Sequence, residues 1–237
     1  MRRTIRRVSA KPIIFQFSLG EERYQKAVDI RETRQQIDYT ATIRKLAENR
    51  TPHAILLTDF SIAEPKNFML LLKVIRYARE GGIVVLSVCF AFTMHFDRFD
   101  QFMKEWGLPW AIHGEHCHRC ILNPSAVGPN TRWKSGLPNI YGFCQFNMVY
   151  LKNVSPESCW YLPEPPRSYG FDGDNKWQPL GRETPVAFSR VGKGYLGFTG
   201  DVDQEEATDA VLFSMLGLNL PLSTEWIFKE EGFKSWY

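Results

Sequence analysis

Cys89 occupies a position in the sequence that favours nucleophilic chemistry. The apolar run at residues 83–88 predicts a central β-strand, and apolar residues at helical spacing follow from Phe92 onwards. The chain therefore turns from strand to helix at Cys89, where the partial positive charge of a helix N-terminus favours the thiolate. The alternative is a buried, inert cysteine, which is a common role for this residue type.

Three of the five histidines lie close together, in the segment 111–120 after the predicted helix. A histidine near a thiol acts as a general base, and we choose His113 and His116 for this role. The only other histidines are His53, before a predicted strand, and His95, within the predicted helix.

The same segment contains a spacing typical of zinc ligands. Cys117 and Cys120 form a C-x-x-C pair beside His116 and His118. Structural zinc is normally held by two separated pairs, and no second Cys/His pair is present. We therefore predict no metal, and an alternating strand with His116 and His118 on one face.

The first half of the chain predicts a strand, helix, strand unit. Residues 13–17 and 54–57 are short apolar runs typical of buried strands. Pro65 opens a helix whose apolar stripe extends to Ala78, and glycines end it before the strand at 83–88. Such a unit has a right-handed crossover and places parallel strands in one sheet.

The second half is less regular. A helix is predicted at 92–106, and a loop-rich pocket or lid segment follows at 108–180, with short strands at 145–151 and 159–162. Residues 185–190 and 195–199 flank a glycine-containing turn and predict a β-hairpin.

A closing helix at 205–216 completes the predicted elements. The domain organisation is a basic flexible tail at 1–11, a single α/β domain at 12–220 and an aromatic C-terminal tail at 221–237. An aromatic tail favours packing on the body of the protein, or on a second copy in a homodimer.

Residues 81–91, Gly-Gly-Ile-Val-Val-Leu-Ser-Val-Cys-Phe-Ala, with the strand and helix before them, resemble the core of the class I glutamine amidotransferase-like superfamily. The hairpin resembles the end of its ThuA-like members. The resemblance implies a flavodoxin-like three-layer sandwich with a mostly parallel central sheet. In PfpI-like relatives a glutamate after the first strand contacts the cysteine, and a histidine follows the cysteine helix. Glu21 lies after the first predicted strand, so the resemblance makes it a candidate.

The chain departs from the glutamine-hydrolysing members of this superfamily. Ser87 and Ala91 replace the two glycines of their Gly-x-Cys-x-Gly elbow, and no histidine follows the hairpin. The resemblance therefore does not imply a glutaminase triad.

Four residues are candidates for substrate contacts. In an open parallel sheet, ligands bind beyond the carboxyl ends of the strands. Asp59 and Phe90 follow two predicted strands, Asp201 follows the hairpin, and Trp110 lies in the loop-rich segment.

Composition limits the classes of function. Hydrophobic residues make up 44% and charged residues 23%, which is typical of a globular domain. The net charge of +3 arises mostly from the basic tail, so we do not predict nucleic acid as a partner. No apolar run approaches the roughly 20 residues that span a membrane. Five cysteines, an odd number, fit reduced thiols in the cytoplasm.

The sequence thus supports three hypotheses. The first is a hydrolase or lyase that acts on a small molecule through Cys89 and a histidine, without a cofactor. The second is a non-catalytic member of the same fold that binds a ligand or a partner. The third is a non-covalent catalyst that uses histidine, aspartate or glutamate and does not use Cys89.

Overall fold

The computed structural model describes residues 14–17, 52–127, 137–141, 148–164, 183–202 and 206–218. Glu21 lies outside these residues, and so do the basic tail and the aromatic tail with its expected role in a homodimer.

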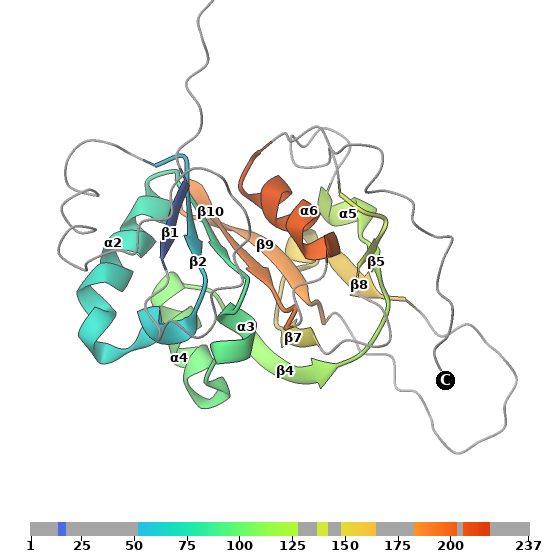
Figure 1. The fold of residues 1–237 in the computed structure, drawn as a ribbon, viewed down its shortest axis with the longest axis horizontal. Helices are drawn as coiled ribbons and strands as arrows, with labels where there is room; N and C mark the ends of the chain where they lie inside the picture. Colours follow the sequence, from blue (N-terminus) through green and yellow to red (C-terminus); the bar gives the residue numbers. More distant parts are fainter. Residues whose placement is uncertain are drawn as a thin grey trace, which may run out of the picture.

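A five-stranded sheet forms the centre of this structure (Figure 1). In spatial order the strands are β1 (Ile14–Phe17), β2 (Ala54–Leu57), β3 (Ile83–Leu86), β10 (Gly194–Thr199) and β9 (Val186–Val191). The first four run parallel, and β9 pairs antiparallel with β10. The prediction of an α/β fold with a mostly parallel sheet is confirmed, and the predicted hairpin is present.

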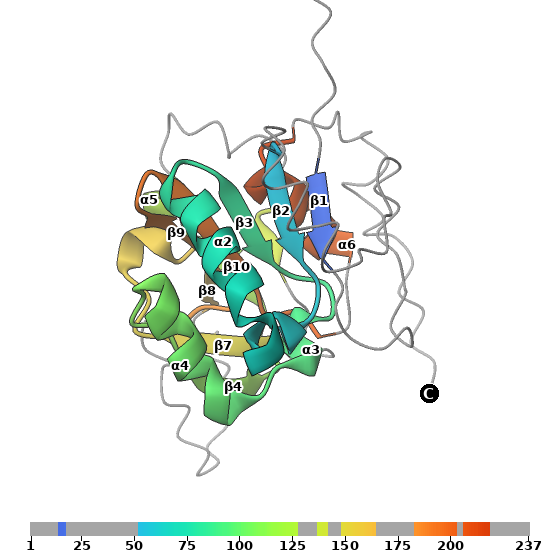
Figure 2. The same cartoon turned by 90° about the vertical axis from the view of Figure 1, so that its left-hand side faces the viewer.

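Helices cover both faces of the sheet (Figures 1 and 2). On one face, α2 (Phe68–Arg79) and α4 (Phe96–Trp106) contribute to a core cluster with alternate side chains of β2 and β3. On the other face, α6 (Glu206–Met215) packs in a second cluster with the remaining side chains of these strands. All residues of β2 and β3 are buried, as expected for parallel strands covered on both faces.

Proline and glycine residues mark where helices begin and end. A turn of 3₁₀ helix, η2 (Phe60–Ala63), follows β2, and Pro65 begins η3 (Pro65–Asn67), which leads into α2. Gly107 ends α4 with φ 77°, and its N–H donates to the carbonyls of Met103 and Lys104. Glycine suits this position because it has no Cβ to oppose a left-handed conformation.

The single helix predicted at 92–106 is wrong at its start. The chain forms a short helix, α3 (Phe90–Thr93), and begins α4 only after an extended residue, Met94, with ψ 135°. The Thr93 hydroxyl donates to the Cys89 carbonyl and accepts from the Phe60 N–H, both at 2.9 Å. A side chain that bonds to backbone groups in this way offers an alternative to continued helix.

The loop-rich segment contains two small antiparallel sheets. β4 (Ala111–His116) pairs with β7 (Met148–Lys152), and β5 (Cys120–Leu122) lies between β6 (Ile140–Tyr141) and β8 (Tyr161–Pro163). Two short turns, α5 (Pro124–Val127) and η4 (Pro156–Ser158), complete this region. In the whole part of the chain that the structure describes, no helix is long and apolar enough to cross a membrane.

The strand expected to hold both His116 and His118 needs correction. β4 ends at His116, and His118 lies in the connection to β5. The His118 carbonyl lies 3.5 Å from the Tyr150 hydroxyl and 3.7 Å from the Cys120 sulfur. Side chains, and not a neighbouring strand, therefore contact this carbonyl.

Val88 follows β3 in the left-handed conformation, with φ 64°. A β-branched residue rarely adopts this conformation, which costs about 1–3 kcal/mol. The preceding residue, Ser87, is held on both sides: its N–H donates to Leu57 of β2, and its hydroxyl lies 2.6 Å from that of Thr199 of β10. The ends of three strands thus fix the turn that contains Val88.

A comparison of alanine and glycine variants at position 88 measures this strain. From Val88→Ala to Val88→Gly, we expect the free energy of unfolding to rise by about 1 kcal/mol, because glycine adopts a positive φ without a Cβ clash. Val85 of β3 is also buried, in the same core cluster, and is the matched control. There the same step should lower stability by about 0.5–1 kcal/mol. Urea unfolding of the four variants tests this, and a loss at both positions would contradict strain at Val88.

Candidate functional site

The carboxyl ends of the parallel strands meet near α3, at the edge of the sheet where β4 and β7 also lie (Figure 1). Met148 of β7 pairs with His116 of β4 and forms a β-bridge with Asp201, which follows β10. The β4–β7 pair therefore adjoins the edge at which an open parallel sheet binds ligands.

Cys89 lies at this edge but is largely enclosed. Its side chain is 7% exposed and belongs to the same core cluster as Val88 and Met148. The helix that it precedes, α3, has only four residues. Because the helix dipole is a sum over aligned peptide units, so short a helix favours a thiolate much less than the long helix expected from the sequence.

The four expected substrate-binding residues have structural contacts. Phe90 is fully buried, with its ring centroid 5.5 Å from that of Phe60, and Trp110 is 2% exposed in the same core cluster. Asp59 accepts a hydrogen bond from the Ser61 N–H at 2.9 Å and caps η2. Asp201 is 3% exposed and accepts from the Thr208 hydroxyl, which ties the end of β10 to α6.

The histidines form a cluster that we define as His113, His116, His118, Glu183 and Tyr150. The ring centroids of His113 and His116 lie 5.2 Å apart, and those of His116 and His118 lie 5.9 Å apart. The pairing of β4 with β7 shifts register between Ile112 and Gly114, which places His113 in an irregular part of the strand. A bulge of this kind re-aims a side chain, and such bulges are common next to active sites.

Glu183 joins this cluster from a distant part of the chain. Its Oε1 lies 2.8 Å from Nδ1 of His113, and it precedes Thr184, which forms a β-bridge with Leu151 of β7. Nothing in the sequence near Glu183 distinguishes it from other acidic residues, so it was not among the candidates. Only the pairing of distant strands brings it to His113.

Tyr150 supports the cluster from the neighbouring strand. Its ring centroid lies 5.6 Å from that of His116 and 6.2 Å from that of His118. Its hydroxyl lies 3.1 Å from the sulfur of Cys120, and the side chain is fully buried. A buried tyrosine normally has a partner for its hydroxyl, and this partner fixes the ring against which the two histidines pack.

His116 is held in its neutral form. Burial lowers the pKa of its imidazole, the neighbouring His113 and His118 lower it further, and Glu183 offsets part of this effect. Its Nε2 and the Oε2 of Glu183 are buried, and neither has a hydrogen-bond partner. A neutral imidazole beside an imidazole paired with a carboxylate is an arrangement suited to proton transfer.

Among the residues that the structure describes, no group of three or more His, Cys, Asp or Glu side chains is arranged to hold a metal ion. Cys120 of the expected C-x-x-C pair is fully buried against Tyr150, whereas Cys117 is partly exposed.

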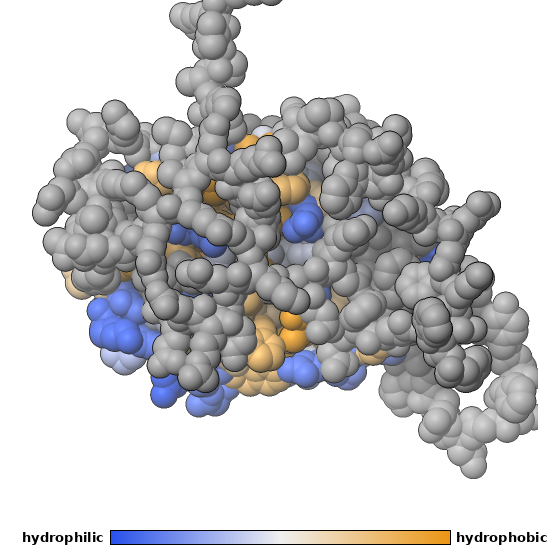
Figure 3. Space-filling view, in the orientation of Figure 1, coloured by the Kyte–Doolittle hydropathy of each residue, from blue (hydrophilic) through white to orange (hydrophobic). Residues whose placement is uncertain are grey.

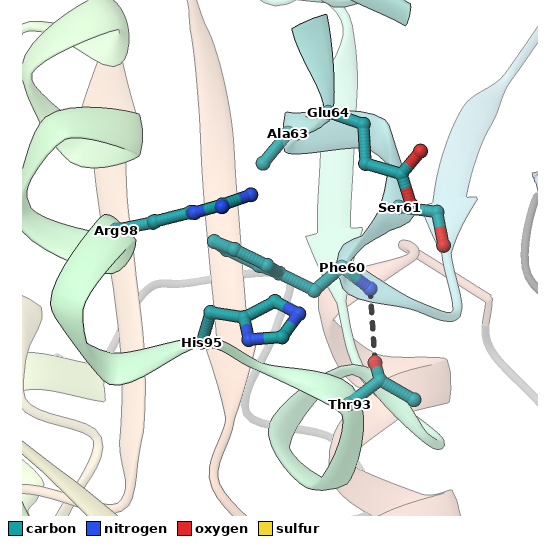
Figure 4. Close-up of a pocket in the computed structure, with 7 residues that line it drawn as sticks. All are labelled: Phe60, Ser61, Ala63, Glu64, Thr93, His95 and Arg98. Atoms are coloured by element: carbon teal, nitrogen blue, oxygen red, sulfur yellow. Dashed lines mark hydrogen bonds between the residues drawn. The ribbon is translucent and has the colours of Figure 1, made fainter.

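A separate small hollow of about 40 Å³ lies between the residues that follow β2 and those that follow β3 (Figure 4). We call it the edge hollow and define it by its lining residues, Phe60, Ser61, Ala63, Glu64, Thr93, His95 and Arg98. His95, at the start of α4, was not among the candidates because the sequence placed it inside a longer helix.

The pH dependence of stability tests the environment of His116. Because its pKa is lower in the folded than in the unfolded chain, the unfolded chain binds more protons, and stability falls as pH decreases below about 6.5. We expect His116→Gln to reduce this loss, measured as the free energy of urea unfolding from pH 7.5 to 5. Ile112→Val on the same strand is the control and should keep the wild-type slope. An unchanged slope in His116→Gln would contradict this environment.

The exposure of the cysteines predicts an order of alkylation. Of the four cysteines among the described residues, Cys89, Cys120 and Cys159 are buried and Cys117 is partly exposed, so iodoacetamide should modify Cys117 of the native protein before the other three. Peptide mass spectrometry over a time course resolves each site, and urea-unfolded protein provides the control in which all react. Modification of Cys89 ahead of Cys117 would identify an activated thiolate.

Comparison with known proteins yields no relative from which to transfer a function. No family model matches the chain, and no curated protein or solved structure is similar to it.

Proposed function

We propose that this protein is an enzyme that acts on a small molecule by histidine acid–base chemistry, as a hydrolase or a lyase. The observation that carries the proposal is the contact of 2.8 Å between Nδ1 of His113 and Oε1 of Glu183. This is the third of the hypotheses that the sequence supports, with His113 retained as the base and Glu183 added.

The contact with Glu183 determines the tautomer of the His113 imidazole. Nδ1–H of His113 donates to Glu183, so the lone pair of the neutral ring lies on Nε2. Nε2 then takes a proton from a water molecule in hydrolysis, or from the substrate in an elimination. The carboxylate stabilises the imidazolium that forms and keeps the ring oriented. Glu183 is therefore a positioning residue.

His116 supplies a second imidazole next to the first. Its lowered pKa keeps it neutral at pH 7, so it does not add a positive charge that would oppose protonation of His113. Two neighbouring imidazoles with different environments suit an exchange of one proton between substrate and protein.

We propose that the fold is flavodoxin-like and related to the glutamine amidotransferase-like superfamily. Parallel β1, β2, β3 and β10 with helices on both faces support this assignment. An odd number of cysteines supports a reducing compartment, and the proposal includes a cytoplasmic location.

Covalent catalysis by Cys89 is the second candidate, and one observation favours it. The strained residue Val88 immediately precedes Cys89 at the end of β3. Strained turns between a strand and a helix present the nucleophile in several hydrolases. In those turns the strained residue is itself the nucleophile, whereas here it is a valine, so we rank this candidate second.

Activity measurements on variants distinguish the two candidates. A panel of esters, amides and hydroxy acids provides the substrates for the wild-type screen. With the substrate so found, His113→Gln should lower kcat by about 10²- to 10⁴-fold, and Glu183→Gln by about 10- to 100-fold. Cys89→Ser should retain activity. His53→Gln is the control, because His53 lies before β2 and contacts the Leu216 carbonyl.

Two results would decide against histidine catalysis. Wild-type turnover in His113→Gln would remove His113 as the base. Loss of turnover in a folded Cys89→Ser variant would transfer the reaction to the cysteine.

A further inference from the structure

We infer that the edge hollow binds the carboxylate group of a small monocarboxylic acid that has an apolar body. This inference is independent of the histidine cluster, because no residue of that cluster lines the hollow.

The hollow lies where an open parallel sheet binds its ligands. Phe60, Ser61, Ala63 and Glu64 follow β2, whereas Thr93, His95 and Arg98 follow β3. β2 and β3 are adjacent parallel strands, so the segments that follow them meet beyond their carboxyl ends. Ligands of α/β proteins bind in this crevice because helix starts and loops converge there.

Arg98 brings a positive charge to the lining of the hollow. Arg98 forms no ion pair with a carboxylate of the described chain, and the His95 side chain makes no hydrogen bond within it. Figure 4 shows Arg98 extending from α4 over the ring of Phe60 towards Ala63, with His95 on the other side of that ring. The guanidinium thus retains its N–H donors for a ligand.

Several other polar groups of the hollow have protein partners. The Thr93 hydroxyl donates to the Cys89 carbonyl, and the Ser61 N–H donates to Asp59. Glu64 is the one carboxylate in the lining, and its Oε2 lies 2.7 Å from Nζ of Lys66. Asp97 adds a negative charge in the first turn of α4.

Size and charge favour a carboxylate over a phosphate. A hollow of about 40 Å³ holds one small head group, and the planar fork of Arg98 matches a carboxylate in a bidentate contact. A phosphate carries up to two negative charges and would meet Glu64 in the lining, where Arg98 is the one arginine.

Two large apolar side chains next to lining residues of the hollow are exposed. Phe92 and Phe96, the chain neighbours of Thr93 and His95, are 53% and 43% exposed. Figure 3 shows hydrophobic residues gathered around α3, between hydrophilic groups. An apolar ligand body that covers exposed rings gains about 25 cal/mol for each Å² removed from water. The head group therefore belongs in the hollow and the body on these rings.

Nuclear magnetic resonance titration of the full-length protein tests the site with hexanoate. We expect saturable shifts of the Ser61, Thr93 and Arg98 amides in the millimolar range. Arg98→Ala should weaken binding at least 10-fold, whereas Arg76→Ala, an exposed arginine of α2 paired with Glu80, should leave it unchanged. Hexanol, with the same body and no charge, and acetate, with the charge and no body, should each bind at least 10-fold more weakly.

Three results would overturn the inference. The first is no saturable shift at the hollow up to 100-fold excess over the protein, and the second is hexanoate binding that Arg98→Ala does not weaken. The third is tighter binding of inorganic phosphate than of hexanoate at the same amides. Because the variants alter no residue of the histidine cluster, failure here leaves the catalytic role of His113 untouched, and the reverse also holds.

Discussion

Burial of β2 and β3 on both faces is the constraint from which the rest of the structure follows. All eight of their residues are buried, so each face of the sheet needs a covering layer. α2 and α4 cover one face and α6 the other, which leaves only the ends of the strands open. Polar side chains can then gather only at the ends, because burial without a partner costs several kcal/mol. The positions of Asp59, Ser87 and Asp201 are consequences of this arrangement.

The same constraint decides what Cys89 can do. Cys89 follows β3 after Ser87 and Val88, and its small apolar thiol is included in a core cluster. The turn is fixed by the Ser87 hydroxyl, which pairs with Thr199, and the strain falls on Val88. In a nucleophile elbow the arrangement is the opposite, because the strained residue itself carries the reactive side chain and directs it outwards. The histidines avoid this conflict, because they lie on β4 and in the connection after it, where buried residues alternate with partly or fully exposed ones.

Local patterns in the sequence were sufficient to predict the central elements. The strand predicted at 54–57 has these bounds in the structure, and the strand predicted at 83–88 is present from Ile83 to Leu86. The glycines at 192 and 194 indicated the hairpin, and Gly107 indicated the end of α4. These features are determined by residues within one turn or one strand of each other, which a single sequence displays directly.

The candidate site could be predicted only in part, for a physical reason. His113 and His116 were identified because histidines are rare in this chain and close together in it. Glu183 and Tyr150 were missed, since they reach the histidines through the pairing of β7 with β4 and with Thr184. The break at Met94 was missed because it depends on Phe60, a residue from another strand end, which donates to Thr93.

Long-range pairing also explains why the histidine cluster and the edge hollow are better understood as two sites than as one. The cluster is built by β4, β7 and the residue before Thr184, whereas the hollow is built by the segments after β2 and β3. The two assemblies share the carboxyl edge of the sheet but no strand. If the cluster transfers protons and the hollow binds an anion, as we propose, a change in one need not alter the other, and a substrate that uses both must extend along the edge. That geometry favours an elongated ligand, with its charged end at Arg98 and its apolar body outside the hollow.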